Sequence, residues 1–300
     1  PDQHFEKWSG TFNGKIQPTS WSISNVEQSV LGITARANMG EQTTGRSGYA
    51  LKVYDAEVGA ANITEVSPGY ATCGETWMYF AGLSNLNAST AGTKGGISFT
   101  YRPDSIVTWI KREGADVDKQ AYQIIFYSWR GTSEGTAYKG KDGSCTSYTV
   151  TNEESDIRQK NDANDCTTSK QATQIAEGWL RDTVKQGYSD WTRISIPISY
   201  FVANQKPEMC NVIFSAGNYP NKRDSKGLYA GLSLTVDDVE LIYNSTIDEL
   251  QINGTKVKGF SATTTEFTKA NEKVSYSPEA DDFTLFRSGR LLDADEYTIN

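Results

Sequence analysis

The sequence predicts an all-β protein folded as a β-sandwich. Short runs rich in β-branched and aromatic residues recur along its 300 residues, and clusters of Gly, Asn and Ser separate them. Patterns with the period of a helix are scarce. Many short strands with turn signals between them favour a sandwich over a parallel sheet. The length is sufficient for one large β domain or for two domains of unequal size.

The clearest strand signals lie in residues 30–37, 50–54, 77–81, 96–102, 122–129, 192–198 and 211–215. Every second residue from Ile194 to Ile198 is isoleucine, whereas Arg193 and Ser195 are polar, which predicts one buried and one open face. Residues 122–127, by contrast, are apolar on both faces. This is typical of a strand that is covered on both sides or that faces an aromatic-lined groove.

Three features interrupt or end the strand pattern. Residues 131–168 are rich in Gly, Ser, Thr, Asn, Asp and Lys, and they predict a long polar insertion. Residues 169–179 are the best helix candidate, although they also fit a strand. The pair Asn253-Gly254 is a strong hairpin signal in a short tail. We therefore expect a sandwich over residues 1–244 and a small or truncated β-module over residues 245–300.

The segment from Leu234 to Tyr243 has strand character on both sides of two adjacent carboxylates, Asp237 and Asp238. The apolar residues before the pair and those after it have opposite parity. Because side chains alternate along a strand with a period of two, this switch predicts a β-bulge or kink at the pair. The favoured interpretation is that one aspartate accepts backbone N–H bonds at the kink, while the other faces solvent or a pocket.

Composition and charge exclude several functional classes. The net charge of −8 and the absence of a basic run argue against nucleic acid as a partner. No apolar window approaches the about 20 residues of a membrane span, so no transmembrane segment is expected. The only histidine is His4, which excludes a Ser/His/Asp triad.

The four cysteines lack the Cys-x-x-Cys spacing of the usual zinc sites, so no such metal centre is expected. We favour a disulfide between Cys145 and Cys166, which would stabilise the insertion by roughly 3 kcal/mol in the chain-entropy model, while the other pairings stay open. Cys73 and Cys210 lie near strand-like runs and are expected to be small buried hydrophobes.

Five stretches of the sequence resemble, in order, those of a known family: residues 4–8 (HFEKW), 18–21 (PTSW), 96–105 (GISFTYRPDS), 191–200 (WTRISIPISY) and 236–241 (VDDVEL). Over about residues 5–244 the chain resembles the carbohydrate metabolism domain family of Bacteroidetes. This resemblance implies a galactose-binding-like β-jelly roll with a small immunoglobulin-like β domain, in exported proteins of glycan use. It also implies a sugar pocket without an established reaction. The insertion departs from the family pattern and could cover or reshape that pocket.

A sugar site needs an aromatic ring for the apolar face of the pyranose and planar polar side chains for its hydroxyls. The candidates are Tyr101, Arg102, Asp104, Trp109, Lys111, Trp129, Asn218, Tyr219 and Asp237. Each has a plainer alternative. Arg102 and Asp104 could close a turn, the two tryptophans could be core, residues 217–221 could be an ordinary turn, and Asp237 could serve the bulge.

One cofactor is considered. In the jelly rolls that this chain resembles, an acidic residue of the last strand and an early one such as Glu6 can join in a structural calcium site, because carboxylate and carbonyl oxygens suit that ion. Otherwise no cofactor is expected.

We predict an exported, monomeric carbohydrate-binding protein whose partner is an oligo- or polysaccharide, located outside the cell, in the periplasm or at the outer-membrane surface. One alternative is a glycoside hydrolase, which usually needs two carboxyl groups about 5 to 9.5 Å apart. Acids such as Glu75 and Glu240 are available, but the catalytic residues are unassigned. A second alternative is a structural or adhesive surface protein without a sugar site.

Overall fold

The computed structural model describes residues 1–30, 32–60, 63–79, 90–131, 133–138, 145–151, 169–170, 173–180, 184–202, 205–217, 228–243, 246–247, 249–258, 261–263, 267–268, 283–287 and 290–292. All regular elements within these ranges are β-strands, which confirms the predicted all-β class.

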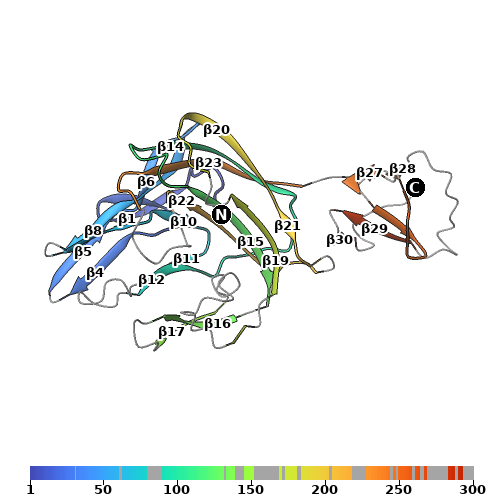
Figure 1. The fold of residues 1–300 in the computed structure, drawn as a ribbon, viewed down its shortest axis with the longest axis horizontal. Coiled ribbons are helices and arrows are strands. Elements are labelled where there is room, and N and C mark those ends of the chain that lie inside the picture. The colour runs from blue at the N-terminus through green and yellow to red at the C-terminus, as the bar shows by residue number, and fades with distance from the viewer. Residues whose placement is uncertain are drawn as a thin grey trace.

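Two antiparallel sheets form a sandwich (Figure 1). The β15 sheet has the order β21 (Ser199–Tyr200), β19 (Thr173–Leu180), β15 (Gln123–Arg130), β22 (Met209–Ser215), β10 (Tyr70–Thr72) and β3 (Ser22–Ile23), and β13 (Ile97–Ser98) also pairs with β22. The β14 sheet has the order β20 (Tyr188–Pro197), β14 (Ser105–Glu113), β23 (Ser233–Ile242), β7 (Tyr49–Tyr54) and β6 (Gly40–Thr44).

Smaller sheets surround the sandwich. Four are hairpins: β1 (Trp8–Phe12) with β2 (Lys15–Pro18), β4 (Val26–Val30) with β5 (Ile33–Ala37), β8 (Ala56–Ala60) with β9 (Ile63–Ser67), and β11 (Glu75–Tyr79) with β12 (Thr90–Lys94). A three-stranded sheet has the order β17 (Cys145–Thr151), β16 (Ser133–Tyr138) and β18 (Ser169–Lys170). The single strand predicted over residues 30–37 is thus wrong, because Gly32 takes a φ of 82° and turns the chain into a hairpin.

The helix predicted over residues 169–179 is also wrong, since β18 and β19 occupy this segment. Strand β19 pairs along its length with β15, and Ile175 and Ala176 are completely buried. Gly178 has no Cβ, and an added one would lie 2.9 Å from Ile198. Packing in the sheet therefore overrides the weak helical pattern of this stretch.

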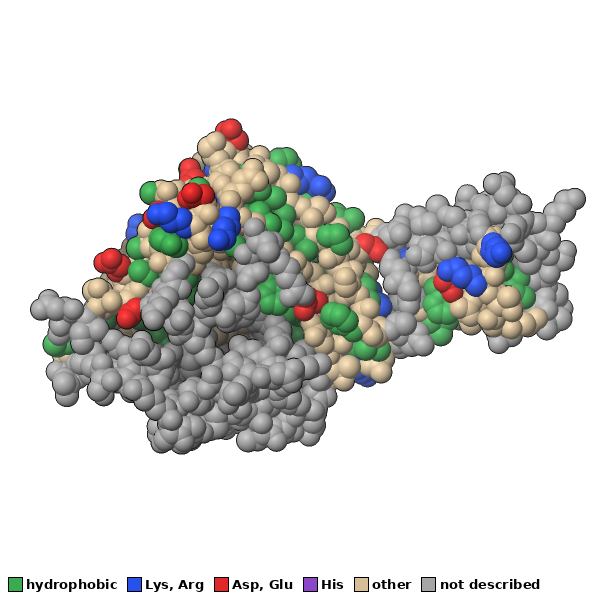
Figure 2. Space-filling view, viewed as in Figure 1, with side chains coloured by type: hydrophobic (Ala, Val, Ile, Leu, Met, Phe, Trp, Pro, Cys, Tyr) green, Lys and Arg blue, Asp and Glu red, His purple; other side chains and the backbone are tan. Residues whose placement is uncertain are grey.

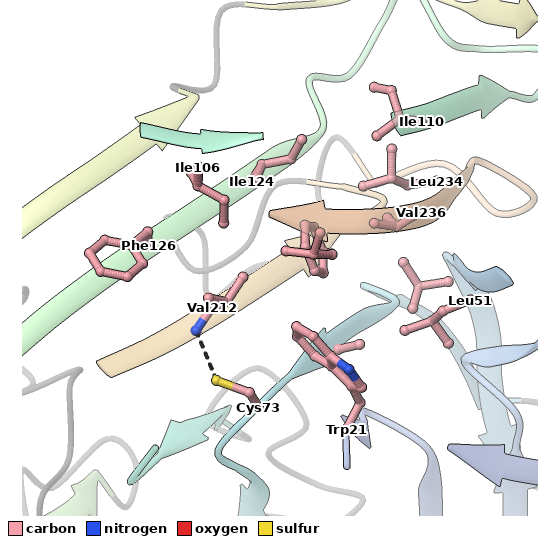
Figure 3. Packing of buried hydrophobic residues seen from close by; sticks show 14 of the residues in the cluster. Trp21, Leu51, Cys73, Ile106, Ile110, Ile124, Phe126, Val212, Leu234 and Val236 are labelled. Atoms are coloured by element: carbon pink, nitrogen blue, oxygen red, sulfur yellow. Dashed lines mark hydrogen bonds between the residues drawn. The ribbon is translucent and has the colours of Figure 1, made fainter. Parts of the chain in front are cut away.

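The core lies between the two sheets (Figure 3). Ile106, Ile110, Leu234 and Val236 from the β14 sheet meet Ile124, Phe126 and Val212 from the β15 sheet, and Trp21 and Leu51 complete this cluster. In each strand these residues share one parity, so the alternation in the sequence determines which side chains point inward.

Strand β15 is covered on its other face too. Its outward residues Ile125, Tyr127 and Trp129 form a second buried cluster with Tyr70 and Ile213. The Tyr70 hydroxyl donates a hydrogen bond of 3.3 Å to the carbonyl of Gly92, which belongs to β12. The prediction that residues 122–127 are covered on both sides is confirmed.

Cys73 and Cys210 are unbridged and buried, as predicted. The Cys73 sulfur accepts the backbone N–H of Val212 at 3.2 Å (Figure 3), and burial raises the pKa of the Cys210 thiol. Cys166 lies outside the described residues, so the Cys145–Cys166 bridge stays a prediction, as does the predicted insertion over most of its length.

The C-terminal strands pair with one another and lie to one side of the sandwich in Figure 1. They form two sheets. The first has the order β24 (Thr246–Ile247), β27 (Ser261–Thr263) and β28 (Phe267–Thr268). The second has the order β26 (Thr255–Lys256), β25 (Glu249–Ile252), β29 (Phe283–Arg287) and β30 (Arg290–Leu291). Their apolar cluster consists of Leu250, Val257, Leu285 and Leu292. Asn253 and Gly254 have φ of 48° and 75°, which confirms the predicted hairpin turn.

A buried polar cluster lies at the end of the sandwich where β7 and β14 end and β15 begins. Asp55 is 1% exposed, Arg112 1% and Gln120 3%. One Asp55 oxygen accepts the N–H of Gly69 at 3.0 Å, and Arg112 donates to the Gln120 carbonyl at 3.0 Å. The second Asp55 oxygen, two Arg112 nitrogens and the Gln120 amide group have no hydrogen-bond partner among the described residues. Burial raises the pKa of Asp55 to about 7.

This shift predicts a pH dependence of stability. Between the ordinary pKa of 3.8 and about 7, the folded chain keeps a proton on Asp55 that the unfolded chain releases. The free energy of unfolding therefore falls as pH rises through this window, by at most about 1.4 kcal/mol per pH unit for one proton. Urea unfolding from pH 4.5 to 8 should show a shallower fall in the Asp55→Asn variant. The exposed Asp190→Asn variant should keep the wild-type slope, and equal slopes in all three proteins would contradict the assignment.

Candidate functional site

The structure distributes the predicted site residues over three places. Trp109, Lys111 and Asp237 lie on the outer face of the β14 sheet, Tyr101, Arg102 and Asp104 form a corner just before β14, and Trp129 lies on the covered face of β15. Asn218 and Tyr219 lie outside the described residues. Only the first group shares one face of one sheet.

The outer face of the β14 sheet follows from strand parity. Ile106 and Ile110 point into the core, so Trp109 and Lys111 point away from it. Trp109 is paired directly with Arg193 on β20 and with Asp237 on β23. These outward residues therefore form a continuous row across three strands.

A second indole lies beside this row. Trp191 comes two residues before Arg193 on β20, so it is a diagonal cross-strand neighbour of Trp109. The Lys111 ammonium lies 5.2 Å from the centre of the Trp191 ring. Both indoles are partly exposed. We call the surface formed by Trp109, Lys111, Trp191 and Arg193 the tryptophan face.

The predicted bulge borders the tryptophan face. Val107 pairs with Glu240 and Trp109 pairs with Asp237, so two residues of β23 lie opposite Thr108 alone. The extra residue is Asp238, whose φ of 47° is in the left-handed region. The bulge and its position are therefore confirmed.

Asp237 satisfies one backbone donor at this bulge and one in the β6–β7 turn. One carboxylate oxygen accepts the N–H of Asp238 at 2.8 Å, and the other accepts the N–H of Arg46 at 2.7 Å. The residue is 1% exposed, and burial raises its pKa although the two N–H bonds act in the opposite direction. This confirms the favoured structural interpretation, and a role of Asp237 as a sugar ligand stays a prediction.

Asp238 joins the bulge to the β6–β7 turn. Its oxygens accept hydrogen bonds from the Arg46 guanidinium and from Nδ1 of His4, the latter at 2.8 Å. Partial burial acts to raise the Asp238 pKa, but the bonds to His4 and Arg46 outweigh it and leave the pKa lowered. The Arg46 guanidinium also lies 3.9 Å from the centre of the Trp109 ring, which holds this indole in place.

Three carboxylates near the bulge have protein donors. Glu6 accepts the N–H of Tyr49 at 3.0 Å, in addition to the bonds of Asp237 and Asp238. Among the residues that the structure describes, no three His, Cys, Asp or Glu side chains gather into a group that could hold a metal ion. The structural calcium site stays a prediction.

Tyr101 forms an exposed corner away from the tryptophan face. Its ring is 66% exposed and meets the ring of Tyr243 edge to face, with the centroids 6.3 Å apart. Tyr101 precedes Trp109 by eight residues. The strand part of that stretch rises about 3.3 Å per residue, which places the two rings too far apart to share one site.

Arg102 and Asp104 fasten this corner to neighbouring segments. Arg102 is buried and donates to the carbonyls of Val202 and Gln205 at 2.9 and 2.8 Å. The backbone N–H of Asp104 donates to the carbonyl of Ile242 at 2.7 Å. These contacts match the structural alternative for both residues. Trp129 matches its core alternative as well, since it is completely buried.

The sequence interpretation missed Trp191, Arg193 and Arg46 as site residues. A signal existed for the first two, because extending the alternation of residues 192–198 back by one position places Trp191 with Arg193 on the open face. No sequence signal marks Arg46, since only the pairing of β7 with β23 brings the β6–β7 turn to the bulge.

On the side of the molecule in Figure 2, acidic and basic side chains of the described residues are interspersed, without one broad basic field. The described residues contain no helix that is long and apolar enough to cross a membrane.

The chain is similar to solved structures of other proteins. No protein-family model and no curated protein matches this chain. Two solved structures are similar, each described as a "putative glycoside hydrolase". One, from Bacteroides thetaiotaomicron, has a TM-score of 0.47 and 14% identity, and the match covers 81% of this chain and 71% of the other. The second, from Bacteroides vulgatus, has a TM-score of 0.47 and 14% identity, with 80% and 96% covered. Likeness at this level transfers no function to this chain.

The bulge contacts predict the effect of replacing Asp237. In Asp237→Asn the amide nitrogen faces a backbone N–H, so one buried donor loses its acceptor, and we expect the free energy of unfolding to fall by about 1–3 kcal/mol. Urea unfolding at pH 7 measures this, with the exposed Asp190→Asn as the matched control. Wild-type stability of Asp237→Asn would show that the carboxylate does not hold the bulge.

Proposed function

We propose that this protein binds an oligo- or polysaccharide through the tryptophan face. The observation that carries the proposal is a pair of partly exposed indoles, Trp109 and Trp191, on adjacent strands of one sheet, with Lys111 and Arg193 beside them. A pyranose presents an apolar face that stacks on an aromatic ring, and its hydroxyls need polar partners at the ring's edge. This face offers both within two strands.

The fold supports the face as a rigid platform. The backbone of Trp109 is held by the β14 ladder, and the Arg46 guanidinium lies over its ring, 3.9 Å from the ring centre. Side chains that are ordered before binding lose less conformational entropy when the ligand arrives. A sheet surface also suits an extended glycan better than a single small sugar, because several outward-facing side chains of the protein lie in a row.

We propose binding in preference to hydrolysis. Asp237 is paired with Trp109 in the ladder and Asp238 follows it at the bulge, and both carboxylates accept hydrogen bonds from the protein itself. They are thus poorly suited to act as the acid and base pair that glycoside cleavage usually requires. The expected jelly-roll topology, which the sandwich of two antiparallel sheets supports, belongs to this proposal. Export, the monomeric state and a part in glycan use are proposed with it.

A glycan-array screen with affinity measurements tests this function. We expect selective binding by the wild type, and at least a tenfold loss in Trp109→Ala and in Trp191→Ala, because about 1.4 kcal/mol of stacking is removed. Tyr101→Ala is the matched control, since it removes an exposed ring at the separate corner. A loss in Tyr101→Ala alone would move the site to that corner, and a blank array for the folded protein would refute carbohydrate binding.

A further inference from the structure

We propose that the tryptophan face selects acidic glycans, which carry uronate carboxylates or sulfate esters, and that Lys111 and Arg193 contact the anionic group. This inference rests on the proposed carbohydrate binding and adds the chemical class of the ligand. It follows from how the charged side chains of the β14 sheet are paired.

Each indole of the face has a cation next to it. Arg193 is exposed and directly opposite Trp109 in the ladder, and Lys111 lies with its ammonium 5.2 Å from the Trp191 ring centre. Lys52 on β7 continues the row of Lys111, because both residues pair with Thr235 on β23. A sugar ring stacked on either indole would thus have a positive group within the reach of one long side chain.

Three acidic side chains of the same region are already engaged or buried. Asp238 pairs with Arg46 and His4, and Glu41 pairs with Lys15 at 2.7 Å. Asp237 is buried under its two backbone N–H bonds. Two exposed acids lie at the ends of these strands: Glu240 is opposite Val107, beyond the bulge, and Glu113 is opposite Ser233 at the end of β14.

Lys111 and Arg193, by contrast, form no ion pair with any other residue of the described ranges. Cations without a protein counter-ion, next to aromatic rings, are suited to a ligand that brings both an apolar face and a negative charge. The guanidinium of Arg193 can donate two parallel hydrogen bonds to a carboxylate or sulfate.

The charge of the whole chain makes these local cations selective. At a net charge of −8 the protein repels a polyanion in general, so binding depends on contacts made at the face itself. A neutral glycan would require neither cation. The arrangement therefore favours acidic chains by direct pairing rather than by a general field, and this pairing weakens as salt rises.

The test compares glycans that differ only in charge. Binding is measured by calorimetry for polygalacturonate oligosaccharides and their methyl esters, and for chondroitin sulfate and chondroitin that has been both desulfated and carboxyl-reduced, at low and high salt. We expect the wild type to bind at least one acidic probe at least tenfold more tightly than its neutral counterpart. Lys111→Met and Arg193→Gln should each remove most of this preference, whereas Lys258→Met, at an exposed lysine in the turn after β26, should not.

The outcomes separate the two proposals. Equal binding of charged and neutral probes, with loss in Trp109→Ala, overturns the selection of acidic glycans and leaves carbohydrate binding intact. A preference for acidic probes that survives both cation variants overturns the assignment of Lys111 and Arg193. A folded wild-type protein that binds neither these probes nor any glycan of the array overturns both proposals.

Discussion

The buried carboxylate of Asp237 holds the register on which the β14 sheet depends. Strand β23 must place Leu234 and Val236 in the core before the bulge and Val239 after it, although these positions differ in parity. One extra residue resolves the conflict, but it leaves backbone donors without ladder partners. Asp237 accepts the N–H of Asp238 at the bulge and that of Arg46 in the β6–β7 turn, so both halves of the strand keep their apolar side chains buried.

The same bulge organises the candidate site. Because Asp238 takes a left-handed conformation, its carboxylate turns outward and binds Arg46 and His4. Arg46 in turn lies against Trp109. A device that the strand needs for its packing thereby fixes the ring on which we propose the ligand stacks. The members of this network are far apart in sequence. The pairing of β6, β7 and β23 brings Arg46 to the bulge, and the bond from the Val239 N–H to the Gln3 carbonyl brings His4 there.

The two sheets of the sandwich differ in how far their outer faces are covered by other segments. The outer face of β15 is buried around Trp129, and the β11–β12 hairpin contacts it through Tyr70. The outer face of β14 keeps Trp109 and Lys111 partly exposed. Aromatic residues of the same kind thus serve packing on one sheet and are available for binding on the other. Composition alone does not separate these uses, since the difference lies in what covers each sheet.

The sequence by itself determined the all-β class, the strands over residues 50–54, 122–129, 192–198 and 211–215, the bulge at Asp237 and Asp238, and the double coverage of residues 122–127. These depend on local periodicity, which neighbouring residues express directly. It failed for residues 169–179, where pairing with β15 outweighs a weak local preference. Only the tertiary structure separated Tyr101 from Trp109, buried Trp129 and brought Arg46 to the bulge. Those outcomes depend on strand order and register, which join residues far apart in the chain and leave no local pattern.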